Sequence, residues 1–243
     1  MSLGAGVPRY FEAVEQLHGL ARSNVAPYLE SIFGGLELAG KDMLDVGGGP
    51  GLNTFYAACC GASVLCLEAE AAGSAADAAR RFTELASLLD VEHVTLCRST
   101  LQAFDAEGKT FDVVLLHNSI NHLDEAACMA LRDRSSARAA YAGLCRTLAD
   151  LTNPGGQLVV TDCSPYNVFP LLGRRNPYAP TIEWRKHHRP SVWIELLCQA
   201  GFADAKVTWP APYRLRGLGP VLLGNEVASF FLSSHFRIQM EKG

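Results

Sequence analysis

The chain has 243 residues, of which 49% are hydrophobic and 19% are charged, so it is long and apolar enough to fold as one α/β domain. Its net charge of -4 argues against nucleic acid as the main partner, because binding to a phosphate backbone normally requires a basic face. The apolar runs are too short to span a bilayer, and the eight cysteines lie in apolar stretches without the C-x-x-C spacing of a zinc site. We therefore expect a cytoplasmic protein with core thiols, no membrane association and no structural metal.

Two helices are expected first, at residues 8–20 and 23–33, because apolar residues recur there at spacings of three and four. A buried strand at 43–46 then runs into the glycine-rich turn 47–51. Further strand candidates are residues 63–67, 93–97, 111–116, 157–161, 205–209 and 227–234. Helix candidates are residues 52–60, 74–89, 124–151 with a break near Ser135, and 190–200.

This alternation of strands and helices predicts an α/β fold, a mostly parallel sheet with helices on both faces. In such sheets ligands bind beyond the carboxyl ends of the strands. No internal repeat and no long linker divides the chain, so we expect a single domain over residues 1–243, with N-terminal helices at 1–40.

The glycine turn has the pattern Gly47-x-Gly49-x-Gly51. A dinucleotide-binding turn would place its third glycine at the position of Leu52, so that pattern does not fit. Asp45 precedes the turn, where a carboxylate would be badly placed beside a pyrophosphate but would suit a cationic ligand. The alternative is a purely structural bend between strand and helix.

Residues 43–51 resemble the first motif of the class I S-adenosylmethionine-dependent methyltransferases, in which two apolar residues, an acid and another apolar residue precede G-x-G-x-G. Residues 111–114 resemble the fourth strand of that family, and residues 154–158 and 200–202 its turns before the fifth and sixth strands. The resemblance covers about residues 40–235. It implies a Rossmann-like seven-stranded sheet whose last strand is antiparallel, and S-adenosylmethionine as the cofactor.

The resemblance also implies roles for individual residues. The turn, with Gly47, Gly49 and Gly51, would contact the methionine part of the cofactor, and Asp45 would contact its amino group. The acid that ends the next strand in this family binds the two ribose hydroxyls, and that position is Glu68, 23 residues after Asp45. A carboxylate has two acceptor oxygens and suits both donors.

Two further cofactor contacts are assigned with less support from the motif. Many family members carry an aspartate after the third strand that contacts adenine, whereas this chain has Cys97-Arg98-Ser99 there. We assign the adenine contact to Ser99 or to the backbone. His117, at the end of the fourth strand, completes the predicted cofactor set.

The turn after the fourth strand should lie near the transferred methyl group. It lacks the Asn- or Asp-Pro-Pro-aromatic sequence of amine-methylating enzymes, so we expect oxygen as the acceptor atom. Magnesium ligation looks incomplete, because His117-Asn118 and Asp162-Cys163 stand where catechol-type enzymes place their carboxylates. His122 is the predicted general base. The alternative is a capping role, and catalysis would then rest on proximity or on a base from the insertion such as His187 or His188. Asn118 and Asn121 would orient the substrate or cap the turn.

Residues 163–189 form a predicted insertion after the fifth strand, between a cofactor-binding core at 41–162 and the end of the sheet at 190–243. The insertion is basic, and we expect Arg185 and His188 to face an acceptor that carries a carboxylate or phosphate. A solvated charged face is the alternative.

The predicted function is therefore methyl transfer from S-adenosylmethionine to a small molecule, at oxygen and without a metal. The alternatives are a cofactor-binding module without catalysis and an RNA or protein methyltransferase. The sequence pattern does not decide the oligomeric state.

Overall fold

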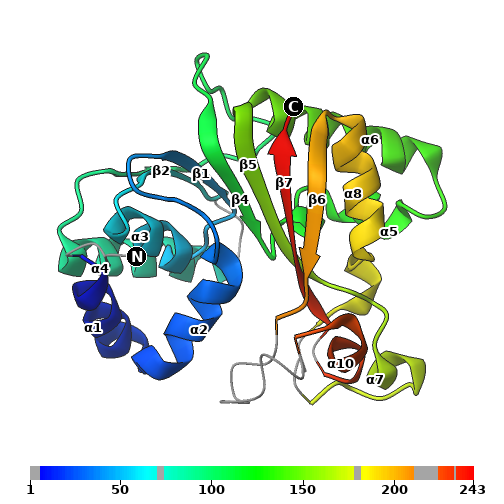
Figure 1. The fold of residues 1–243 in the computed structure, drawn as a ribbon, viewed down its shortest axis with the longest axis horizontal. Coiled ribbons are helices and arrows are strands. Elements are labelled where there is room, and N and C mark those ends of the chain that lie inside the picture. The colour runs from blue at the N-terminus through cyan, green and yellow to red at the C-terminus, as the bar shows by residue number, and fades with distance from the viewer. Residues whose placement is uncertain (1–5, 70–73, 178–181, 211–223, 233) are drawn as a thin grey trace. The chain divides into compact units, whose positions relative to one another are not determined.

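The computed structural model describes residues 6–69, 74–177, 182–210, 224–232 and 234–243 (Figure 1). The chain divides into two compact units, Met1–His117 and Asn118–Gly243. Each unit contributes strands to a sheet and carries its own helices, and each is described by itself below.

The first unit holds four strands, β1 (Asp42–Val46), β2 (Ser63–Leu67), β3 (Val94–Cys97) and β4 (Phe111–His117). β1 runs parallel to β2 on one side and to β4 on the other, so that Leu44 lies opposite both Leu65 and Val114. The last four residues of β1 are all buried, as expected for a central parallel strand. Asp45 is the one charged residue among them.

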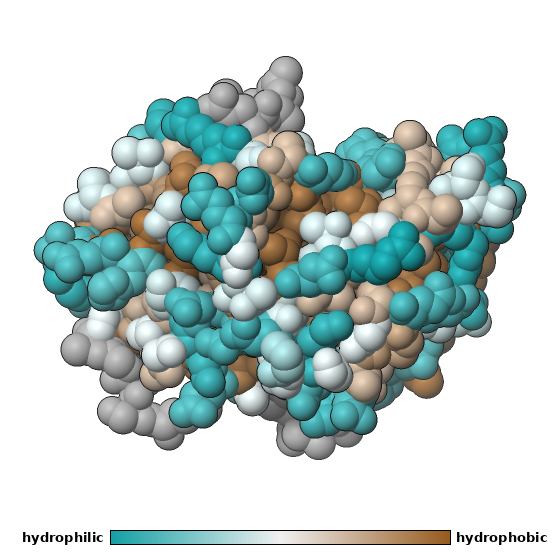
Figure 2. Space-filling view, turned by 90° about the horizontal axis from the view of Figure 1, so that it is seen from above, coloured by the Kyte–Doolittle hydropathy of each residue, from teal (hydrophilic) through white to brown (hydrophobic). Residues whose placement is uncertain are grey.

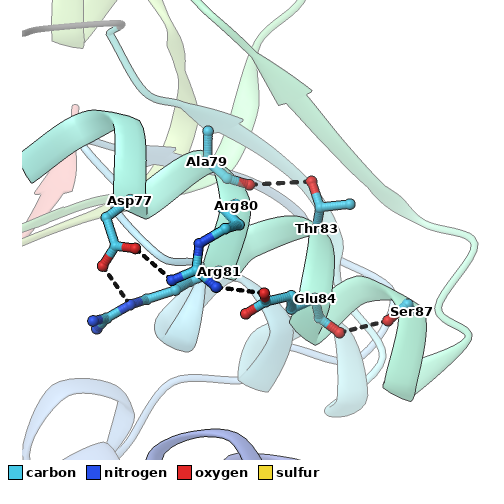
Figure 3. A network of polar contacts seen from close by, with 7 residues as sticks. All are labelled: Asp77, Ala79, Arg80, Arg81, Thr83, Glu84 and Ser87. Carbon is cyan, nitrogen blue, oxygen red and sulfur yellow. Dashed lines mark hydrogen bonds and ion pairs between the residues drawn. The ribbon is translucent and has the colours of Figure 1, made fainter.

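Four helices pack in the same unit, α1 (Val7–His18), α2 (Arg22–Phe33), α3 (Leu52–Cys59) and α4 (Ser74–Leu89). Helix α4 carries a charged outer face in which Arg80 bonds Asp77 and Glu84 at 2.6 and 2.5 Å (Figure 3). These side chains are exposed, and ion pairs of this kind add little to stability. The network therefore marks a solvent-facing surface of α4.

The second unit holds β5 (Thr152–Cys163), β6 (Phe202–Thr208) and β7 (His235–Lys242), with β7 antiparallel to both of its neighbours. Its helices are α5 (Glu125–Ala130), α6 (Ser135–Asp150), α7 (Val168–Leu171), α8 (Pro190–Gln199) and α10 (Glu226–Phe231). Two short 3-10 turns, η1 (Ile120–His122) and η2 (Trp184–Lys186), complete the described part of this unit.

The strand order is β3-β2-β1-β4-β5-β7-β6, a seven-stranded mixed sheet. The predicted Rossmann-like α/β class and the antiparallel last strand are thereby confirmed. The predicted break near Ser135 is confirmed as well, because α5 and α6 are separate helices. The organisation as a single domain stays a prediction.

The predicted strand at 227–234 was wrong. Residues Glu226–Phe231 form α10, whose first turn is capped by the Asn225 side chain accepting the backbone N–H of Ala228 at 2.9 Å. The last strand begins only at His235. A short apolar run without alternation does not separate a helix from a strand, and a capping asparagine before it favours the helix.

Hydrophilic residues are spread over the face shown in Figure 2, with hydrophobic residues showing between them. Among the described residues, no helix combines the length and the apolar character that crossing a bilayer requires.

Candidate functional site

The glycine turn leaves the carboxyl end of β1 with Gly47, Gly49 and Gly51 all at positive φ, between +55° and +84°. A Cβ built on Gly48 would lie 2.4 Å from Sγ of Cys66, so the turn packs closely against β2. A Cβ on Gly49 would meet nothing within 4 Å. The turn is thus closely packed at Gly48, whereas described protein atoms leave the space beside Gly49 unfilled.

Asp45 lies beneath this turn and is fully buried. Its Oδ2 accepts the hydroxyl of Thr54 at 2.6 Å, whereas Oδ1 has no hydrogen-bond partner in the part of the chain that is described. Burial raises the pKa of Asp45 to about 6, the Thr54 hydroxyl lowers it, and the charge of Glu68 raises it further. A buried carboxylate oxygen without a donor is costly, so this atom is suited to a cationic or N–H-bearing ligand.

Glu68 follows β2 directly and is half-buried. Its Oε2 accepts the backbone N–H of Gly49 at 2.7 Å. Asp45 of β1 and Glu68, directly after the neighbouring strand β2, therefore both lie against the glycine turn. Their assignment as ligand contacts stays a prediction.

Tyr28 of α2 is a neighbour of this site that the sequence analysis missed. Its Oη lies 2.7 Å from Nε2 of His117, and the two rings meet edge to face at 5.4 Å. The Asn53 side chain also hydrogen-bonds Tyr28, and burial raises the pKa of the phenol. Tyr28 lies in an apolar helix stripe beside Val25 and Leu29, so no signal in the sequence separates it from a core residue.

Ser99, the predicted adenine contact, lies in the loop after β3 and is half-buried. Its hydroxyl donates to the carbonyl of Thr100 at 3.2 Å. A role toward adenine stays a prediction.

His122, the predicted base, lies in η1 with 52% of its side chain exposed. Its Nδ1 is 2.7 Å from Oε1 of Glu125, and Nζ of Lys186 is 2.9 Å from the other oxygen of the same carboxylate. Lys186 first, and then His122, hold the pKa of Glu125 below its usual range. His122 is thus an exposed member of a charged network.

The two asparagines of the same turn differ in burial. Asn118 is exposed with φ +52°, and its backbone N–H donates to the carbonyl of Thr161 at 2.9 Å. Asn121 is 2% exposed, and its side-chain oxygen has no partner among the residues described. Their roles toward a substrate stay predictions.

The two residues predicted to face the acceptor from the insertion also differ. Arg185 is exposed. His188 is 2% exposed, its Nε2 donates to the carbonyl of Cys128 at 2.8 Å, and burial lowers its pKa. Both stay predictions as substrate contacts, and residues 178–181 of the insertion lie outside the described part of the chain.

A second pair of a histidine and a carboxylate lies at the carboxyl end of β5. Asp162 is fully buried, and its Oδ1 lies 2.7 Å from Nδ1 of His187. Its Oδ2 accepts the indole N–H of Trp193 in α8 at 3.3 Å. From the sequence, Asp162 is interpreted only as part of an incomplete metal site, because nothing in the sequence pairs it with a histidine 25 residues later.

The residues of the first unit fit S-adenosylmethionine. Oδ1 of Asp45 is a buried acceptor without a donor, which an amino group of the methionine part would satisfy. The space over Gly49 allows close approach to the backbone, and Glu68 offers carboxylate acceptors for hydroxyl groups.

If Glu68 accepts hydroxyl donors of the cofactor, Glu68→Gln should weaken S-adenosylmethionine binding by about 1.5 kcal/mol, roughly tenfold, because one charged acceptor becomes a donor. Calorimetric titration measures this difference. Glu84→Gln, which changes an exposed carboxylate of α4, is the control and should bind like the parent. Equal affinity of the Glu68→Gln protein would assign the hydroxyls to another acceptor.

Residues 44–160 match the family described as a methyltransferase domain. No curated protein matches the chain in sequence. Among solved structures, an S-adenosylmethionine-dependent methyltransferase from Mesorhizobium loti is 19% identical with a TM-score of 0.59, covering 90% of this chain and 98% of its own. An S-adenosylmethionine-dependent methyltransferase from Thermotoga maritima is 14% identical with a TM-score of 0.59, covering 96% of this chain and 100% of its own. An O-methyltransferase family protein from Burkholderia thailandensis is 18% identical with a TM-score of 0.56, covering 90% and 56%.

These structures show the fold, and the match over residues 44–160 supplies the type of domain. The glycine turn with its buried acid belongs to the matched segment, and the seven-stranded order with an antiparallel β7 is the fold of the same enzymes. Residues 44–160 are thus similar to a methyltransferase domain, and the sheet that they share in has the class I methyltransferase fold.

Proposed function

We propose that the protein transfers a methyl group from S-adenosylmethionine to an oxygen atom of a small molecule, without a metal ion. The observation that carries the proposal is the engagement of both oxygens of Asp162, one by His187 and one by Trp193. Both oxygens of this carboxylate, near the end of β5, already accept hydrogen bonds, and one of them positions a histidine, which supports a protein base over a metal ion. A protein side chain would then take the acceptor's proton.

The residues of the first unit would hold the cofactor through Asp45, Glu68 and the open turn at Gly49. S-adenosylmethionine supplies a methyl group on a positively charged sulfur, so the protein mainly has to align the acceptor and exclude water. His122 remains the base that the sequence predicts, and it competes with His187 for that role.

The net charge of -4 supports a small acceptor over a polyanion. The exposed Arg185 in the insertion supports an acceptor with a carboxylate or phosphate. All eight cysteines are free thiols, which supports a reducing compartment such as the cytoplasm. The chain would act as a single domain, with residues 163–189 as a substrate cap.

The test is an incubation with S-adenosylmethionine carrying a deuterated methyl group and the small-molecule fraction of a cell extract. We expect a labelled O-methyl product, formed with S-adenosylhomocysteine at a rate that a metal chelator leaves unchanged. Parallel incubations with the RNA and protein fractions cover the alternatives. Label found only in those fractions, or cofactor binding without turnover, would contradict the proposal.

A further inference from the structure

Three consecutive residues of the insertion are anchored one by one. Lys186 pairs with Glu125 of α5 at 2.9 Å, His187 bonds Asp162 at the end of β5, and His188 donates to the carbonyl of Cys128 in α5. The Sγ of Cys128 lies 3.1 Å from the carbonyl oxygen of Lys186, which ties the backbone to the same helix. The residues on both sides of His187 are thus anchored to α5, and its imidazole is hydrogen-bonded to Asp162.

The hydrogen bonds of Asp162 fix the chemical form of His187. An ionised carboxylate only accepts, so Nδ1 of His187 must carry the proton that bonds Oδ1. In the neutral ring this leaves Nε2 unprotonated, and no hydrogen bond joins Nε2 to any other described residue. The side chain is 11% exposed, so the ring is largely withdrawn from water without being sealed off.

We infer that His187 is the general base of the methyl transfer and that Asp162 and Trp193 are its positioning residues; this inference rests on the proposed function. The acceptor's O–H proton moves to Nε2 of His187 while the acceptor oxygen forms the new bond to the methyl carbon. The electron pair of the broken C–S bond returns to sulfur, which leaves as neutral S-adenosylhomocysteine. The imidazolium that results lies against the buried carboxylate of Asp162 and later gives its proton to water.

The geometry favours His187 over His122. The carboxylate partner of His122, Glu125, is 47% exposed and shares its charge with Lys186. The partner of His187 is fully buried and accepts from a second fixed donor, Trp193. A buried carboxylate that accepts two hydrogen bonds holds an imidazole in one orientation and stabilises its protonated form. An exposed carboxylate, screened by solvent and salt, does so poorly. The hydrogen bond to Asp162 also brings His187 to the carboxyl end of β5, and α/β sheets bind ligands at the carboxyl ends of their strands.

The first test reads the tautomer and needs no substrate. Long-range proton–nitrogen NMR of the histidine-labelled protein at a pH where the ring is neutral should show His187 protonated at Nδ1. In Asp162→Asn the side-chain oxygen has to face the N–H of Trp193, which can only donate, so the amide N–H faces His187 and the ring should shift to the Nε2-protonated form. Wild-type protein protonated at Nε2, or an Asp162→Asn protein without the shift, would overturn the inference.

The second test uses the labelled-methyl assay on the product that the wild-type enzyme forms. His187→Ala should lose about 10²- to 10⁴-fold in rate, while its affinity for S-adenosylmethionine by calorimetry stays unchanged. Added imidazole should restore part of that rate, because it replaces a missing proton acceptor but not a missing structural contact. His93→Ala, which removes an exposed histidine before β3, is the control and should be neither slowed nor stimulated.

The outcomes separate the two proposals. If the wild-type enzyme labels no small molecule, the proposed function is contradicted, and so is the assignment of His187 as the base. A wild-type enzyme that labels its product, together with a fully active His187→Ala protein, overturns the base assignment alone. In that case His122→Ala shows whether the loss of rate falls on the other histidine.

Discussion

Gly49→Val is expected to abolish measurable binding of S-adenosylmethionine. The residue has φ +55°, a conformation that a β-branched side chain adopts only with strain of about 1 to 3 kcal/mol. Its Cβ would also project into the open space over the turn, where the backbone has to approach the cofactor closely. Calorimetric titration of the folded variant should show no binding heat at concentrations that saturate the parent.

Gly19→Val is the matched control. Gly19 ends α1 with φ +63°, and a Cβ there meets nothing within 4 Å, so the backbone strain is similar while the glycine turn is untouched. This variant should lose comparable thermal stability and keep its affinity. A folded Gly49→Val protein that binds like the parent would remove the turn from the cofactor site. Equal loss of binding in both variants would assign the effect to stability.

Most of the fold could be predicted because its signals are local. Strands such as Ser63–Leu67 and helices such as Ser74–Leu89 occur where the apolar spacing placed them. The exception is the end of the chain. There the buried apolar residues of β7, Phe236, Ile238 and Met240, recur with a period of two, a signal that the more apolar stretch at 227–234 obscured.

The candidate site divides along the same line. Asp45 and the glycine turn are adjacent in the sequence, and Glu68 follows at a spacing that the parallel pairing of β1 and β2 imposes. A sequence motif is therefore enough to identify these residues as candidates. The contact of Tyr28 with His117 joins residues 89 positions apart, and that of Asp162 with His187 joins residues 25 positions apart. Such pairs depend on how helices and loops pack, and no local pattern encodes that packing.

Asp45→Asn should make the free protein less sensitive to pH and weaken its binding of the cofactor. Burial raises the folded pKa of Asp45 to about 6 from its ordinary value of 3.8, so the folded state holds the proton more tightly than the unfolded chain does. Its contribution to stability is then full below about pH 4 and is lost as pH rises through about 6. Asparagine does not titrate. The free energy of unfolding of Asp45→Asn relative to that of the parent should therefore increase by up to about 3 kcal/mol between pH 4 and pH 7.

The same substitution should weaken S-adenosylmethionine binding by about 1.5 to 3 kcal/mol, roughly 10- to 150-fold, because Oδ1 loses its charge as an acceptor for a cationic group. Denaturant unfolding at both pH values and calorimetry at pH 7 give the two readouts.

Thr54→Val is the companion variant, since it removes the hydroxyl bonded to Oδ2 and keeps the carboxylate. Without that donor the pKa of Asp45 should rise further and the fall in stability with pH should steepen. A pH response that is the same in the parent and in Asp45→Asn would mean that Asp45 is not the buried titrating group. A pH response that disappears with unchanged affinity would mean that its charge serves the fold and not the cofactor.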